Sequence, residues 1–571
     1  MLDGRKRPEV ETALHALERK EFVRRERRPS VGGEEEYAFR HLLVRDVAYG
    51  QVPRAARAER HESAARWIEA LGRPEDHGEM LAHHYLEALR LGRESGTELS
   101  EELPQRARRA ARDAGDRALA LGAYGVAERF FAAALELWPE DDDERPELLL
   151  AYGRSRVEDQ TVDDAVFEEA RDELLRAGKV EPAAEAEARL GSIWMLRGDQ
   201  DAALQHLEYA RELVEERGPS AEKAFVLQEL GRILMMAEHL DRSIRIARES
   251  LAIAEELGLE GSRARNLNTM GCARIVAGDV GGVDDLERAV EVAAAANSHE
   301  EVAAVSNLHS MMVILGDLPR ARELHVQAQE VADRLGLIGF IDWQRGEHAM
   351  HCYWDGRWEE ALTTADEFIR EVEAGLSHYM VVACRFVRAL IWLARGEIDA
   401  GVAEARRTTE LARTAKDPQV LSPALAAEGR ALLTAGDDAA AGEIADELLE
   451  TWKSAHLRQA AECVEAARLF RGLGREEEFL RVIDEVPGPT PWHEAARRYA
   501  SGDLTGAADT YAVIGTVPDE AHSRLKAAEH FVAVGDRAAA DVQLRLALSV
   551  FAQLGATAWT AEAEALLAES A

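Results

Sequence analysis

Three side chains that could bind a soft metal share one face of a predicted helix. His351 and Cys352 follow His348 by three and four residues, so all three fall on adjacent turns of the same side. Imidazole and thiolate at this spacing could hold zinc if a fourth ligand came from a neighbouring element. A turn at Gly356, however, places His348 and Cys352 at large inward positions, and free cysteine is commonly buried. We therefore assign the group to core packing and predict neither a metal nor a cofactor.

No motif for catalysis or nucleotide binding is complete in this sequence. His61, His299 and His493 each begin H-E-x-x-H, but the second histidine is missing in every case. There is no G-x-S-x-G nucleophile motif and no G-x-x-x-x-G-K-[ST] phosphate loop, since the pair Gly178-Lys179 follows no glycine-rich segment. We therefore expect a protein that is not an enzyme.

The composition predicts the kind of scaffold that positions these residues. The chain has 571 residues, 47% hydrophobic and 31% charged but only 6% aromatic, which favours packed helices over sheets. No apolar run approaches the roughly 18 residues that span a bilayer, and no signal peptide is recognisable at the N-terminus. The cysteines are too scattered for a disulfide framework or zinc knuckle. We expect a cytoplasmic protein without membrane contact.

Charge is unevenly distributed along the chain. The formal net charge is −37, but residues 1–60 carry 14 Lys or Arg and 11 Asp or Glu, which leaves −40 on the remainder. An acidic surface repels nucleic acid and anionic membranes. Any nucleic-acid contact would therefore be confined to the mildly basic N-terminal segment.

A repeat of about 40 residues organises the acidic part. Glycine followed by a charged residue recurs at intervals of 38, 40, 40 and 40 residues, at Gly278, Gly316, Gly356, Gly396 and Gly436. Gly122, Gly198 and Glu238 extend this series towards the N-terminus, with a weak turn near Gln160. Each turn lies between two amphipathic stretches, which predicts about twelve helical hairpins.

These hairpins resemble tetratricopeptide repeats. The small, large and stop positions of that repeat are matched by Gly115, Ala127, Phe131, Ala134 and Pro139 in one unit and by Leu190, Gly191, Trp194, Ala203, Leu207 and Ala210 in another. The period exceeds the 34 residues of the standard repeat, so helices longer by nearly a turn are expected. The resemblance implies an all-α, right-handed superhelical solenoid over residues 104–571.

The N-terminal segment combines a helix, a hairpin and further helix. Residues 10–22 have helical periodicity, residues 22–28 and 36–40 read as strands around the PSVGG turn, and residues 42–71 return to helix. We predict a partial winged helix over residues 1–45 and linker helices over 46–103. With the array, the segments LERKEFVRRE and EYAFRHLLVRDVAYGQVPRAARAERH resemble the C-terminal region of bacterial STAND-type signalling ATPases, such as large LuxR-like regulators, the maltose-regulon activator and AAA ATPases linked to nucleotide cyclases.

The resemblance gives His41 a candidate role. A histidine of the winged helix in these switches reaches the phosphate of the bound nucleotide, so His41 is a nucleotide-sensor candidate. Leu42 stands where some relatives carry an aspartate, and the alternative is a helix N-terminal residue satisfied by backbone groups. The ATPase itself is absent from the sequence, so we expect it on a preceding segment, with Met1 an internal start, or on a separate polypeptide.

Two functions follow from this organisation. The favoured one is a non-enzymatic regulatory scaffold that binds a protein, peptide or small inducer and couples it to a STAND-type ATPase. The alternative is a DNA-binding transcriptional regulator, since the arginines 24, 25, 27 and 28 line the predicted wing and Lys20 ends a helix that could enter a groove. Pairing of these arginines with Glu34, Glu35 and Glu36 across the hairpin is the simpler explanation, so we do not expect the chain to bind nucleic acid.

An apolar ladder marks the predicted binding face of the array. In successive units, the residues three and two places before the turn position are both apolar. These pairs are Met195-Leu196, Met235-Met236, Ile275-Val276, Val313-Ile314, Tyr353-Trp354 and Leu393-Ala394. One interpretation is a groove for a hydrophobic ligand or amphipathic helix, with Tyr353 and Trp354 as hot spots and Arg232, Asn268, Asn307 and Arg345 as polar anchors. The other is deeper packing of long helices against the next repeat.

Overall fold

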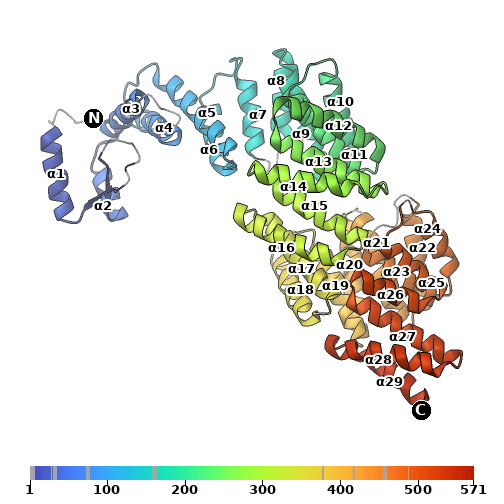
Figure 1. The fold of residues 1–571 in the computed structure, drawn as a ribbon. Helices are drawn as coiled ribbons and strands as arrows, with labels where there is room; N and C mark the ends of the chain where they lie inside the picture. The colour runs from blue at the N-terminus through green and yellow to red at the C-terminus, as the bar shows by residue number, and fades with distance from the viewer. Residues whose placement is uncertain are drawn as a thin grey trace. The chain divides into compact units, whose positions relative to one another are not determined.

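The fold is all-α, as the sequence predicts. The computed structural model describes every residue except 1–6, 28, 30–34, 72–76, 157–163, 198, 376–377, 416–417, 454–459, 487 and 571. Over the described residues it contains 29 helices and one two-stranded hairpin (Figure 1). Within that part of the chain, no helix combines the length and the apolar character needed to cross a membrane.

The chain divides into two compact units, residues 1–193 and 194–571. The first unit consists of α1 (Arg7–Arg19), β1 (Val23–Arg25), β2 (Tyr37–Phe39), α2 (Leu42–Gly50), α3 (Arg54–Ala70), α4 (Gly78–Ser95), α5 (Leu103–Ala120), α6 (Tyr124–Leu135), α7 (Arg145–Ser155), α8 (Asp164–Arg176) and most of α9 (Val180–Leu196). The boundary therefore falls within the array predicted from the repeats.

The second unit is built from helices alone among its described residues. In chain order they are α10 (Gln200–Val214), α11 (Ala221–Met236), α12 (Leu240–Leu257), α13 (Glu260–Val276), α14 (Gly282–Ala295), α15 (Glu300–Leu315), α16 (Leu318–Leu335), α17 (Ile338–Trp354), α18 (Trp358–Glu373), α19 (Val381–Ala394), α20 (Ile398–Ala415), α21 (Pro418–Thr434), α22 (Asp438–Thr451), α23 (Ala460–Gly472), α24 (Glu476–Asp484), α25 (Pro491–Ser501), α26 (Leu504–Ile514), α27 (Val517–Ala533), α28 (Arg537–Leu554) and α29 (Thr557–Ser570).

The N-terminal head, comprising α1, β1, β2 and α2, contains the predicted hairpin. The two strands pair antiparallel, with Val23 opposite Phe39. Arg25 and Glu35 lie 2.5 Å apart, as the ion-pair interpretation predicts. The PSVGG turn, Arg28 and Glu34 lie wholly or partly outside the described residues. Residues 42–71, predicted to be helical, form two helices, α2 and α3; Pro53 precedes α3 and has no N–H to continue a helix.

Local chemistry of the turns sets the repeat. At Gly316 the backbone adopts the left-handed conformation (φ 77°) that ends α15, and the carboxylate of Asp317 then accepts a hydrogen bond from the N–H of Arg320 to begin α16. The four other glycines of the 40-residue series also have positive φ. Glu238 takes this conformation without glycine (φ 60°), which confirms the predicted turn there. The predicted turns at Gly198 and near Gln160 lie outside the described residues.

The hairpins stack through small residues that face large ones. In chain order the described helices make twelve pairs, from α5–α6 to α27–α28, followed by α29, in agreement with the predicted number. A Cβ atom added at Gly115 would lie 2.6 Å from the ring of Phe131, so this glycine is needed for close packing of α5 against α6. The predicted match of these two residues to small and large repeat positions is therefore confirmed.

Within the second unit, the array also packs against itself. The first helices of three hairpins contact the first helices of three later units: α15 meets α25, α17 meets α27 and α19 meets α29. The offset is always ten helices, or five hairpins. Hydrogen bonds cross this seam, from Trp492 Nε1 to the carbonyl of Val313 (2.7 Å) and from Thr557 Oγ1 to the carbonyl of Arg395 (2.6 Å).

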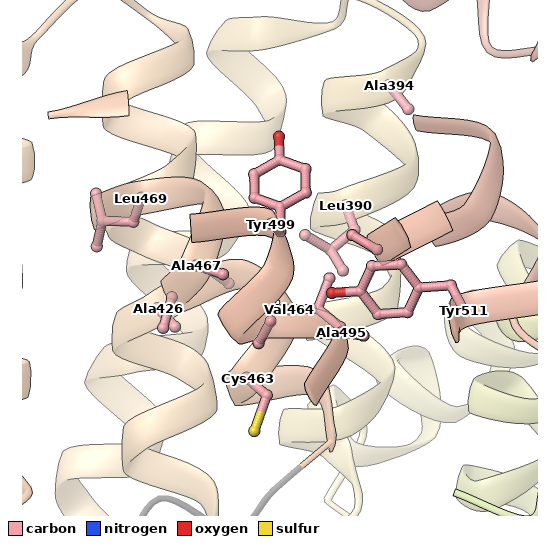
Figure 2. Close-up of a cluster of buried hydrophobic side chains, with 14 of the residues drawn as sticks. Leu390, Ala394, Ala426, Cys463, Val464, Ala467, Leu469, Ala495, Tyr499 and Tyr511 are labelled. Atoms are coloured by element: carbon pink, nitrogen blue, oxygen red, sulfur yellow. The ribbon is translucent and has the colours of Figure 1, made fainter. Parts of the chain in front are cut away.

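The seam is continuous with the largest hydrophobic core. One cluster of buried side chains runs from α17 to α29. Figure 2 shows part of it, where Leu390 and Ala394 of α19 lie near Tyr499 of α25 and Tyr511 of α26. The C-terminal repeats are therefore fastened to the middle ones by burial of apolar side chains, in addition to their contacts along the chain.

A glycine pair tests the seam. The turns at Gly356 and Gly436 have nearly equal φ angles, 76° and 79°, so alanine strains both by about 1–2 kcal/mol. A Cβ at Gly356 would also lie 2.8 Å from Leu554 Cδ2, whereas no atom lies within 4 Å of a Cβ at Gly436. Because Leu554 is buried, we expect Gly356→Ala to lower the free energy of unfolding by about 1–3 kcal/mol more than Gly436→Ala.

Chemical denaturation of both variants measures this difference. Equal losses of stability would contradict the packing of the Gly356 turn against α28.

Candidate ligand-binding face of the repeat array

The predicted ladder lies in the last turn of successive first helices. Its pairs end α9, α11, α13, α15, α17 and α19, which are alternate helices in chain order. Leu196 is 85% exposed and Met236 is 41% exposed, whereas Tyr353 and Trp354 are only 3% and 6% exposed. Between them, Ile275 is buried and Val276, Val313 and Ile314 are partly exposed. The ladder is thus open at its N-terminal end and covered at its C-terminal end.

Tyr353 and Trp354 are core residues, which corrects the hot-spot prediction. The Tyr353 ring stacks on Trp358 with centroids 5.8 Å apart, and Trp354 packs at 6.1 Å against Trp492 of α25. Leu393 and Ala394 are buried as well. The alternative prediction, packing against the next repeat, is supported by the contacts of α17 with α19, and the later helices α25 and α27 cover α17 as well.

The two arginines predicted as anchors are engaged by carboxylates. Arg232 donates to Glu229 at 2.8 Å, and its Nη1 lies 3.4 Å from the sulfur of Met236. Arg345 donates to Glu371 at 2.8 Å and to Asp342 at 3.0 Å. Burial opposes the charge of Arg345, but its bonds to Glu371 come first and raise the pKa of the guanidinium. A ligand would have to compete with these ion pairs.

The two predicted asparagine anchors are joined by a hydrogen bond. Asn307 Nδ2 on α15 donates to Asn268 Oδ1 on α13 at 3.2 Å, and both side chains are partly exposed. This bond uses one donor and one acceptor, so each carboxamide retains the complementary group, the N–H₂ of Asn268 and the C=O of Asn307. Those two groups match the carbonyl and the N–H of a peptide bond. One turn away, Arg265 bonds both Glu229 and Glu300 and links α11 to α15.

A basic pocket lies elsewhere in the second unit, and its residues were not predicted as a site. It encloses about 450 Å³ between α21, α23, α25 and α27 and is lined by Arg430, Arg471 and Lys526, among others. Lys526 donates to Glu529 at 2.7 Å, while Arg471 donates to a backbone carbonyl. A basic cavity in so acidic a chain suits an anionic group. In the sequence, Arg430 is marked only by its position six residues before the turn glycine Gly436, which does not by itself indicate a pocket.

His41 precedes the first residue of α2. Its backbone is extended (φ −129°, ψ 129°), and its carbonyl accepts hydrogen bonds from the N–H groups of Val44 and Arg45. The predicted position at a helix N-terminus is confirmed, but the side chain makes no capping hydrogen bond and is exposed. Its role as a nucleotide sensor stays a prediction.

The three potential metal ligands singled out in the sequence do not act together. His348 Nε2 lies 3.0 Å from Glu360 Oε1 and 3.4 Å from the Cys352 sulfur, whereas His351 turns towards another group of histidines. Burial raises the pKa of the Cys352 thiol to about 12. A third cluster joins His61, His83 and His84 in the first unit.

Known structures resemble the chain only weakly. No family model and no curated protein matches it. A STAND protein with a tetratricopeptide repeat sensor from Pyrococcus horikoshii is 15% identical over 66% of this chain, with a TM-score of 0.37, and this chain spans 54% of its length. The apo quorum sensor NprR from B. thuringiensis is 14% identical (TM-score 0.39, 65% of this chain and 99% of that chain).

A third similar structure is the APC/C hetero-tetramer Cut9-Hcn1, with 11% identity and a TM-score of 0.43 over 80% of this chain and 94% of that chain. At these scores the matches carry no argument about function. The fold rests on the helix pairing described above, and the site on this chain's own residues.

Two substitutions separate the open and covered ends of the ladder. Met236→Glu places a carboxylate at an exposed position, so we expect the melting temperature to stay within about 2 °C of the parent chain. Trp354→Glu buries an uncompensated charge and should cost about 3–5 kcal/mol of stability. Circular dichroism during heating measures both. A Trp354→Glu protein that melts with the parent would show that the seam does not cover α17.

Proposed function

We propose that this chain is a non-enzymatic regulatory scaffold whose array binds an extended peptide segment of a partner protein. The segment lies along the partly exposed faces of α11, α13 and α15. The observation that carries the proposal is the Asn268–Asn307 pair, which presents a donor and an acceptor side by side on a partly exposed face. A peptide backbone needs both groups at every residue.

The distance between neighbouring helices favours an extended peptide over a small inducer as the ligand. Neighbouring packed helices lie about 8–10 Å apart, and three residues of an extended chain span roughly 10 Å. An extended segment can therefore reach one first helix after another, whereas a small molecule would contact a single hairpin. Exposed Met236 beside this face offers a flexible apolar surface for the side chains of the segment.

The second part of the proposal concerns the head. Leu42, Leu43 and Val47 of α2 are all exposed, and this helix buries none of its residues. Contiguous apolar surface of this kind supports docking of another module. We assign that module to a STAND-type ATPase, in the same polypeptide or a separate one, with His41 at the edge of the docked face and directed to the nucleotide. Binding of the peptide at the array would then shift the ATPase between its states.

The asparagine pair gives the first test of this function. Peptides selected from a random display library on the full chain should bind it, and Asn268→Ala or Asn307→Ala should weaken the best of them about 10-fold, the loss expected for one hydrogen bond of roughly 1.5 kcal/mol. Fluorescence anisotropy measures the affinity. Gln205→Ala, an exposed amide on α10, is the control and should bind as the parent does. Selection of no peptide, or equal affinity of all variants, would refute peptide binding.

The head gives the second test. When the full chain is co-expressed with a STAND-type ATPase, Leu43→Asp should abolish co-purification, because a charge on the apolar face cannot be buried without cost. Val534→Asp changes an exposed valine far along the chain and should have no effect. His41→Ala should leave the complex intact and raise basal ATP turnover severalfold. Retention of the complex by Leu43→Asp would exclude α2 as the docking surface.

A further inference from the structure

Three buried histidines meet inside the second unit. His309 of α15, His325 of α16 and His351 of α17 each offer one ring nitrogen within 4.8 Å of the other two, and each side chain is less than a tenth exposed. The Nε2 atoms of His309 and His351 face each other at 2.7 Å. Buried histidines are usually satisfied singly by other polar groups, so a cluster of three on separate helices points to a shared ligand.

Comparison between repeats shows that the two adjacent hairpins that carry these histidines, α15–α16 and α17–α18, differ from the other hairpins at these positions. His309 lies seven residues before a turn glycine, where other units have Gly271, Ala349, Ala389 and Gly429. His325 lies nine residues after the same glycine, where three following units have Ala365, Ala405 and Ala445. His351 replaces Ala273, Met311, Ile391 and Ala431 of the other units. Imidazoles stand where packing alone calls for small or apolar side chains.

The polar atoms of the cluster satisfy one another only in part: the Nε2 atoms of His309 and His351 share a hydrogen bond, and Gln329 Nε2 lies 3.2 Å from His325 Nε2. Glu347 Oε2 lies 3.1 Å from His309 Nδ1 and 4.0 Å from His325 Nδ1, but neither contact has hydrogen-bond alignment. Within the described part of the chain, the Nδ1 atoms of all three histidines and this carboxylate oxygen are buried without a hydrogen-bond partner. Atoms of this kind are costly to bury, so an ion or a water is expected among them.

Burial disfavours the charged form of two of the three rings, those of His325 and His351. Burial, followed by the neighbouring histidines, lowers the pKa of His325 to about 4 and that of His351 to about 2. Both imidazoles are therefore neutral near pH 7 and carry a lone pair. Nitrogen donors select zinc and similar transition metals over calcium and magnesium, which prefer oxygen.

We propose that His309, His325 and His351 bind one divalent ion of the zinc class. Glu347, 3.1 Å from His309 Nδ1, stands beside them as a carboxylate that offsets the charge of the ion. Zinc–nitrogen bonds of about 2.0 Å at tetrahedral angles place two ligand nitrogens about 3.3 Å apart. The His309 and His351 nitrogens need to separate by roughly half an ångström from 2.7 Å to admit it.

Such an ion would join two repeats. It would tie the α15–α16 hairpin to α17, the first helix of the next hairpin, at the level where α15 and α17 also meet the seam helices α25 and α27. The inference is independent of peptide binding, since it concerns the interior of the array and not its open face.

Metal content of the full, untagged chain gives the direct test. Protein purified from zinc-supplemented cells should retain one zinc per chain by mass spectrometry. After removal by a chelator, Zn²⁺ should raise the melting temperature and Co²⁺ should give visible d–d bands without a thiolate-to-metal band in the near ultraviolet. His325→Phe and His309→Leu should lose the bound metal and the shift.

Controls distinguish this site from the other histidine clusters. Cys352→Ser, His84→Ala and the surface change His239→Ala should each keep one equivalent of metal. A thiolate band in the Co²⁺ spectrum, or loss of the metal in Cys352→Ser or His84→Ala, would place the ion elsewhere and overturn the proposal. No retained zinc and no shift on adding Zn²⁺ or Co²⁺ would also overturn it, leaving a buried water in the cluster. If His325→Phe does not fold, the cobalt spectrum of the parent chain still decides.

Discussion

Burial of the first-helix ends of α15, α17 and α19 beneath α25, α27 and α29 determines most other properties of the second unit. A helical hairpin cannot cover its own apolar face, and here the cover comes both from adjacent hairpins and from a later part of the array. The packing of Trp354 against Trp492 is the clearest contact of this kind. Because the seam covers the last turns of α15, α17 and α19, the most exposed ladder residues, Leu196 and Met236, lie on the earlier helices. The proposed peptide site therefore uses α11, α13 and the part of α15 before its last turn.

How far the sequence predicted the molecule depends on how local each feature is. The turns were found because glycine and a capping aspartate act within four residues, as at Gly316 and Asp317. The seam was missed because Trp354 and Trp492 are 138 residues apart, and no sequence pattern near either residue indicates that it contacts the other. The break between α2 and α3 had a local signal, Pro53, but the apolar periodicity on both sides outweighed it. His351 was considered together with His348 and Cys352, but the structure groups it with His309 and His325, which lie on two other helices.

A buried triad of charged side chains also helps to fix the arrangement of helices in the second unit. Arg468 of α23 bonds Glu465 at 2.5 Å and Asp519 of α27 at 2.9 Å, and all three side chains are buried. Burial raises the pKa of the Asp519 carboxyl, although Arg468 favours its charged form. Such a triad adds little net stability relative to apolar packing, but it admits only one alignment of α23 with α27. It therefore complements the seam, which is apolar and by itself tolerant of sliding.

The constant offset of five hairpins has a consequence for how this protein can change length. Open solenoids gain or lose units by tandem duplication, because each unit contacts only its neighbours. Here the turn at Gly356 sits against Leu554, and Thr557 at the start of α29 donates a hydrogen bond to the carbonyl of Arg395 at the end of α19. One additional hairpin between residues 358 and 516 would shift every later helix out of step with its seam partner. Descendants of this chain should therefore vary in repeat number before α15, and keep the count between α15 and α29 unchanged.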